Sequence, residues 1–191
     1  MLRALEYPTN LALSNLAWVV LALPVLTLLP ALVALATALD RWLRHDEQRP
    51  FLGTFAAFLP ALRRLWALSL VAVVLGGAMV VNLAFLASRE GNVAVLLTGL
   101  QVPFALAYLA VLTALVPLAV TRPELGQVEL LRVSALTAAA HPLRTALLVA
   151  AVAACSVLFL WPPLALVFGA SVPLFGCLTA HYDKAAADRR H

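Results

Sequence analysis

Four long stretches of this chain contain no aspartate, glutamate, lysine or arginine, namely residues 7–39, 65–88, 91–121 and 145–182. About 20 apolar residues in a helix span a bilayer core of roughly 30 Å. Each stretch is long enough to cross a membrane. Only 12% of all residues are charged, whereas a soluble domain has about a quarter. The sequence predicts one domain over residues 1–191, an all-α, polytopic transmembrane helical bundle.

The last uncharged stretch is too long for one crossing. As a single helix, residues 145–182 would measure about 57 Å, and Trp161-Pro162-Pro163 interrupts them near the middle. This stretch is therefore either one broken span or two. With five spans the lysines and arginines divide 11 to 2 between the two sides, and with four spans 8 to 5, so the positive-inside rule favours about five crossings. The predicted spans are residues 10–39, 65–88, 93–120, 145–160 and 164–182.

Two prolines divide the first predicted span. Pro24 and Pro30 each lack a backbone donor and disfavour helix in the residue before them. These prolines predict a structural kink or break within residues 10–39. Thr27 or a neighbouring helix is expected to bond the carbonyl groups that such a break leaves free.

Two charged segments predict amphipathic helices at the membrane surface. Within residues 40–64, apolar side chains recur every three or four positions from Phe51 to Leu65, and Pro60 is expected to bend this helix into the second span. Residues 121–144 predict a second such helix, with Pro123 in its first turn. Its expected apolar face consists of Leu125, Val128, Leu131 and Ala135.

The basic residues predict the orientation. With five spans, one side of the membrane holds all but two of the 13 lysines and arginines, and only Arg3 and Arg89 lie on the other. Positive charge accumulates in cytoplasmic loops. We therefore expect the N-terminus outside, the C-terminus in the cytoplasm, and contact between the basic loops and the headgroups of the lipid bilayer. Because these residues lie in short loops beside apolar runs, we expect no nucleic acid partner.

The sequence lacks the usual signs of catalysis. No span contains a formally charged residue, and no HExxH, CxxC, Walker or GxSxG motif occurs. His45-Asp46-Glu47 is interpreted as a solvated turn rather than a metal site. We predict a protein that is not an enzyme and has no cofactor and no metal. The alternative of an enzyme would require loop residues such as His141, Glu129 and Asp46 to meet.

Uncharged polar residues within the spans are the remaining candidates for a binding site. One interpretation is hydrogen bonding between helices, worth about 0.6 kcal/mol per bond. The other is a cavity for a neutral polar solute or a lipid headgroup. The candidate binding residues are Asn15, Trp18, Thr27, Asn82, Gln101 and Tyr108.

The first fifty residues carry a recognisable pattern. Asn15-Leu-Ala-Trp18, Leu23-Pro24 and Thr27-Leu-Leu-Pro30-Ala31 follow one another. This segment resembles the opening of the YesL-like family of bacterial integral membrane proteins, a domain of unknown function. The chain departs from that family at Leu29, where many members have glycine.

The resemblance implies a location in the bacterial cytoplasmic (inner) membrane. Members are often encoded beside carbohydrate uptake systems. This implies an accessory role in carbohydrate uptake, with a sugar transporter subunit as the partner. The alternative that we consider is a small facilitator or binder of a neutral solute or lipid. The oligomeric state stays open.

Overall fold

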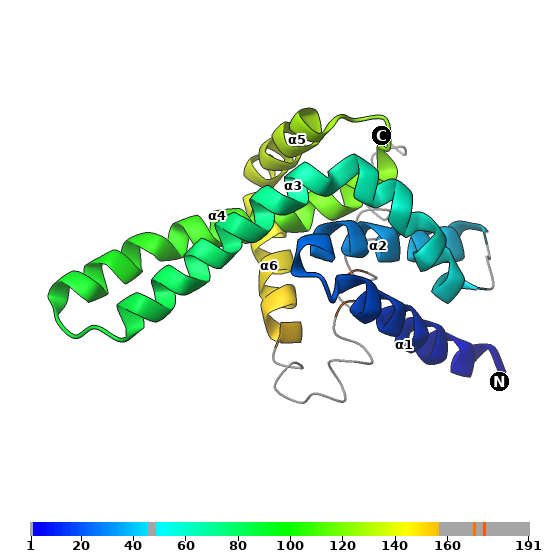
Figure 1. Cartoon of the computed structure of the whole chain (residues 1–191), viewed down its shortest axis with the longest axis horizontal. Coiled ribbons are helices and arrows are strands. Elements are labelled where there is room, and N and C mark those ends of the chain that lie inside the picture. The colour runs from blue at the N-terminus through cyan, green and yellow to red at the C-terminus, as the bar shows by residue number, and fades with distance from the viewer. Residues whose placement is uncertain (1, 46–48, 157–169, 171–173, 175–191) are drawn as a thin grey trace.

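The computed structural model describes residues 2–45, 49–156, 170 and 174. Most of these residues are helical and none lies in a β-strand, which confirms the all-α prediction for this part of the chain. Three segments are long and apolar enough to cross a membrane, namely Val25–Arg44, Pro50–Ala87 and Asn92–Thr121. The elements in Figure 1 are α1 (Leu2–Ala22), a 3₁₀ turn η1 (Val25–Thr27), α2 (Leu28–His45), α3 (Pro50–Ala87), α4 (Asn92–Thr121), α5 (Gln127–Ala140) and α6 (Pro142–Ser156).

The helices form a packed end and a projecting hairpin. At the packed end, α2, the middle of α3, the end of α4 and the start of α5 bury leucines against one another. The remainder of α3 and α4 forms an antiparallel pair that extends away from the other helices, toward the left of Figure 1. The fully buried leucines of the packed end are Leu35, Leu39, Leu65, Leu115 and Leu130.

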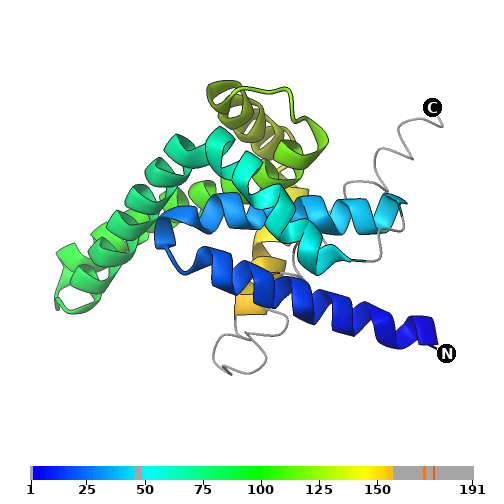
Figure 2. The ribbon, with the colours of Figure 1, turned by 45° about the vertical axis from the view of Figure 1, so that its right-hand side comes forward.

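The predicted single span over residues 10–39 is instead two helices. α1 ends at Ala22, Pro24 takes an extended conformation, and α2 begins at Leu28. Figures 1 and 2 show α1 and α2 running in opposite directions from this break, so the chain turns back rather than continuing in one direction.

Hydroxyl groups bond the carbonyls at this turn. The Thr27 Oγ1 atom lies 2.6 Å from the carbonyl oxygens of both Leu21 and Pro24. Pro30 has no N–H to offer the carbonyl of Leu26, four residues earlier. The Ser69 hydroxyl of α3 donates to that oxygen instead, at 2.6 Å. The turn is thus fixed both within itself and against α3.

Small residues hold α2 and α3 close together. The buried face at the start of α3 consists largely of small side chains, and a Cβ added to Gly53 would lie 3.5 Å from the Cβ of Ala38 in α2. Small residues of this kind let two helix backbones approach closely. The members of this face in α3 are Gly53, Thr54, Ala57 and Ala61.

α3 differs from the prediction for residues 40–64. A short surface helix followed by a separate span was expected, but one helix runs from Pro50 to Ala87 with Pro60 inside it. Figure 1 shows α3 arching along its length. Proline is a common cause of such a bend, because it removes one hydrogen bond without ending the helix. The predicted apolar face is packed in part: Phe55 is exposed, Phe51 and Phe58 are half-buried, and Leu65 is fully buried.

α5 presents a different face from the one predicted. It begins after Gly126, so Pro123 lies in the preceding loop rather than in the first turn. Leu130 and Ser134 are buried, whereas Val128 and Leu131 of the predicted apolar face are exposed. α5 therefore packs against the other helices through few residues, and the apolar side chains of Val128 and Leu131 stay exposed.

The third predicted span, residues 93–120, corresponds to α4, which has nearly the same bounds. α6 covers most of the fourth, residues 145–160, and ends at Ser156 within the described part of the chain. Ala146 and Ala150 of α6 line an apolar groove of about 440 Å³ against α4. Residues 157–160, and the predicted span 164–182 apart from residues 170 and 174, lie outside the described residues.

Candidate functional site

Polar side chains link α3 and α4 inside the projecting hairpin. The Asn82 amide donates to the Gln101 Oε1 atom, and the Gln101 amide donates to the carbonyl of Met79 at 2.8 Å. Nearer the packed end, the Tyr108 hydroxyl donates to the carbonyl of Ala72 at 2.8 Å. The structure thus brings three of the predicted residues onto one interface, where they bond to each other and to the backbone.

Gly76 makes room for Tyr108. A Cβ at position 76 would lie 2.8 Å from the Tyr108 hydroxyl oxygen, closer than real contacts allow. The neighbouring Gly77 has nothing within 4 Å of its would-be Cβ. Only the first of the two glycines is therefore required by the packing of the hairpin.

An open groove runs along the same hairpin. It has a volume of about 570 Å³, and apolar residues of both helices line most of it, among them Leu75, Leu97 and Phe104. Asn82 and Gln101 are its polar lining residues. Asn82 is exposed and Gln101 is buried, so the groove offers one accessible amide within an apolar surface.

The other three predicted residues lie elsewhere, in α1 and η1. Asn15 is fully buried, and its Oδ1 atom accepts a hydrogen bond from the backbone N–H of Ala170 at 2.9 Å. The Trp18 Nε1 atom and the Ser14 hydroxyl are buried, and neither has a hydrogen-bond partner among the described residues. Thr27 bonds the carbonyls of the α1–α2 turn. The six candidates therefore form two groups rather than one site.

Arg64 fixes the loop between α4 and α5 against the middle of α3. Its guanidinium donates to the carbonyls of Ala119, Arg122 and Leu125 at 3.0–3.2 Å. In return, the Gln127 amide donates to the Arg64 carbonyl at 2.6 Å. The last carbonyls of a helix have no partner within the helix, so Arg64 caps the end of α4.

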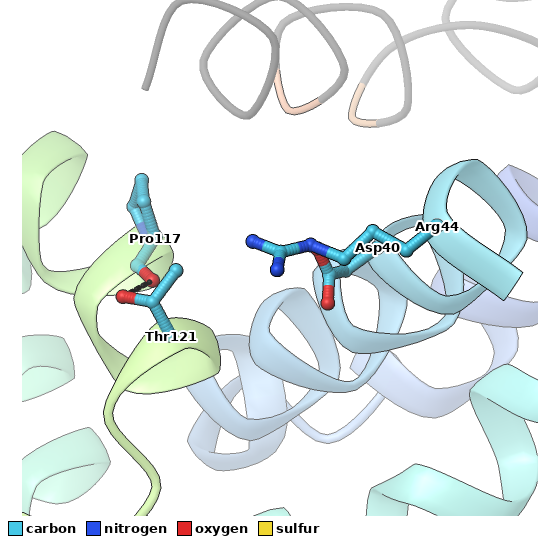
Figure 3. A network of polar contacts seen from close by, with 4 residues as sticks. All are labelled: Asp40, Arg44, Pro117 and Thr121. Atoms are coloured by element: carbon cyan, nitrogen blue, oxygen red, sulfur yellow. Dashed lines mark hydrogen bonds and ion pairs between the residues drawn. The ribbon is translucent and has the colours of Figure 1, made fainter. Parts of the chain in front are cut away.

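Two further polar contacts, one within α2 and one within α4, lie near each other at the packed end (Figure 3). Arg44 and Asp40 form an ion pair at 2.9 Å, and Figure 3 shows the guanidinium extending from α2 toward α4. On α4, the Thr121 hydroxyl donates to the Pro117 carbonyl at 2.9 Å. The charged end of α2 therefore lies beside the end of α4, near the loop that Arg64 holds.

The α3–α4 hairpin offers hydrogen bonds and apolar surface. Among the described residues, no group of three or more histidine, cysteine, aspartate or glutamate side chains lies close enough to hold a metal ion. The arrangement can bind an apolar chain along the groove and a hydrogen-bonding group at Asn82.

Several residues that matter in the structure had no distinct signal in the sequence. Ser69, Arg64 and Gln127 act through partners more than forty positions away, which no local pattern reveals. The Asn82–Gln101 pair did leave a signal. Both residues lie at similar distances from the turn at Gly91, so an antiparallel hairpin brings them opposite each other.

Comparisons with known proteins give one match, to a protein family. No curated protein and no solved structure matches the chain. The family match covers the second half of α1, the turn after it, all of α2, and α3 as far as Leu83. Residues 11–83 match the family described as "Protein of unknown function, DUF624", which supports placing this segment in a domain family of unknown function.

Proposed function

We propose that the chain is a non-enzymatic integral protein of the bacterial cytoplasmic membrane and an accessory to carbohydrate uptake. The observation that carries the membrane part is the exposed apolar surface of the α3–α4 hairpin. Val80, Val81, Val95 and Leu96 are 67–73% exposed. Soluble proteins rarely expose large contiguous apolar patches, and hydrocarbon is the solvent that suits this surface.

The α1–α2 hairpin changes the orientation that we propose for the N-terminus. Since α1 and α2 run in opposite directions, the start of α1 lies at the same end of the molecule as the end of α2 (Figure 2). Arg3 then joins the other basic residues on the cytoplasmic side, and Arg89 alone remains opposite. This arrangement follows the positive-inside rule more closely than an external N-terminus does.

The carbohydrate part of the proposal rests on the resemblance described above. The basic packed end would face the cytoplasm, where Arg41, Arg63 and Arg122 are exposed to headgroups or to a transporter subunit. Deletion of the gene is expected to reduce uptake of at least one radiolabelled sugar, and the wild-type gene on a plasmid should restore it. Unchanged uptake of every sugar tested would contradict the accessory role.

The groove favours a second candidate function, the binding of a lipid. Gln101 bonds to Asn82 and to the backbone, and Tyr108 bonds to the backbone, so among the described residues Asn82 is the one of the three that keeps free hydrogen-bonding atoms. This arrangement does not suit a wide polar channel for a solute. An apolar groove with one accessible amide suits a lipid better. Photoactivatable lipid analogues should label the hairpin of the purified protein, and labelling confined to other helices would argue against this function.

A further inference from the structure

We infer that the α3–α4 groove binds one phosphoglyceride from the leaflet that faces the α3–α4 turn. The inference rests on the proposed membrane insertion and names the ligand of the second candidate function. Three features lie in order along the hairpin: a cation at its tip, an amide farther from the tip, and the apolar part of the groove beyond the amide. A phosphoglyceride carries a phosphate, ester groups and acyl chains in the same order.

Arg89 supplies the cation. It follows the end of α3 at Ala87, and its guanidinium lies over the ring of Phe85, 4.8 Å from the centroid. Among the described residues it forms no ion pair. Arg89 lies beyond the last helical residue of α3 and does not line the groove, but it stands at the same end of the hairpin as the groove residues Asn82 and Leu86. A guanidinium there can form bidentate hydrogen bonds with a phosphate.

Asn82 supplies the amide at the right depth. At 1.5 Å per helical residue, Asn82 lies about 8 Å from Ala87 along the helix axis. Leu75 lies about 18 Å from Ala87 on the same scale. Only one donation by Asn82 is assigned, to Gln101, so its Oδ1 atom and second amide hydrogen have no partner among the described residues. Ester carbonyls lie just beneath the phosphate of a lipid and accept such a hydrogen.

The deeper part of the groove suits an acyl chain. Leu75, Ala78 and Leu100 are exposed apolar residues on its walls. No other described helix covers this part of the hairpin, which projects away from the packed end (Figure 1). An exposed amide would be unsatisfied against hydrocarbon alone, so an occupant that carries an acceptor is favoured over an unfunctionalised alkyl chain.

The test measures phospholipid retention. The full chain is reconstituted with equal parts phosphatidylglycerol and phosphatidylcholine, extracted in mild detergent, and weighed by native mass spectrometry. We expect one retained phospholipid, with phosphatidylglycerol preferred. Ala78→Phe should fill the apolar part of the groove and lower the retention of phospholipid about tenfold. Ala84→Phe, at an exposed position of α3 outside the groove, is the matched control. Arg89→Gln should abolish the preference for phosphatidylglycerol.

Three results would overturn the inference: no retained phospholipid, equal retention by the Ala78 and Ala84 variants, or an unchanged lipid preference in Arg89→Gln. If the lipid-free protein is a dimer and Ala78→Phe makes it monomeric, the groove binds a second copy of the chain instead of a lipid. Circular dichroism establishes that each variant keeps its helical content. Membrane insertion is tested separately, by whether the wild-type protein resists extraction from membranes with alkaline carbonate. A failure of lipid binding is then distinguishable from a failure of the proposed function.

Discussion

Single atoms decide how closely the two helices of the hairpin approach. Gly76 leaves room for the Tyr108 hydroxyl, whereas Gly77 has free space beside it. Gly76→Ala should force the tyrosine away from the Ala72 carbonyl and destabilise the protein by about 1–3 kcal/mol. Gly77→Ala is the matched control and should not destabilise it. Thermal unfolding in detergent measures both, and equal melting temperatures for the two variants would contradict the assigned contact.

One hydroxyl group fixes the α1–α2 turn to α3. Ser69→Ala removes the donor that bonds the Leu26 carbonyl, which Pro30 cannot satisfy. The bond is part-buried, and an ordinary hydrogen bond contributes about 0.5–1.5 kcal/mol, so the free energy of unfolding in a detergent titration should fall by that amount. Ser88→Ala is the control, because the Ser88 hydroxyl bonds a carbonyl of its own exposed turn. A comparable loss in both variants would mean that the Ser69 bond does not stabilise the turn.

At the scale of elements, Arg64 joins three of them. It lies in α3, caps α4 and holds the loop that leads to α5. Arg64→Met should free this loop, with a total loss of about 1.5–3 kcal/mol in the free energy of unfolding. Exposed Glu124 in the loop should then be cut faster by a glutamate-specific protease. Arg63→Met, at the exposed neighbouring position, should leave the rate unchanged, and equal cleavage of both variants would contradict the clamp.

The elements also show how far the sequence predicts this fold. Charge-free runs located α4 almost to the residue, because an apolar span depends on composition alone. Pro24 and Pro30 marked the break before α2, but its direction depends on contacts with α3 that are distant in sequence. The helical character of residues 50–64 was predicted. Its continuity with α3 was not, since a proline inside a helix and a proline at a helix boundary look alike in sequence.

The candidate site was predicted in part. Asn82, Gln101 and Tyr108 stood out as polar residues in apolar runs, and the structure places them on one interface. Asn15 and Trp18 stood out equally, yet they lie on a different helix. A sequence reveals which polar residues are unusual for their surroundings. It does not reveal which of them meet, because that depends on the packing of helices.

At the scale of the molecule, the antiparallel α1 and α2 predict where the N-terminus lies. In a chain with Cys155 and Cys177 replaced by alanine, single cysteines are placed by Arg3→Cys, Arg49→Cys and Glu90→Cys. A membrane-impermeant maleimide applied to intact cells should label position 90 alone. Positions 3 and 49 should label after permeabilisation. Labelling of position 3 together with position 90 would contradict the proposed orientation.

The uninterrupted course of α3 has a mechanical consequence. The helical backbone runs from the projecting hairpin into the packed end with no loop between them, and Pro60 lies on the far side of Arg64 from the hairpin. Transmembrane helices tilt when the thickness of the bilayer changes. A tilt of the distal half of α3 would therefore also move Arg64, because no loop separates the two parts of the helix.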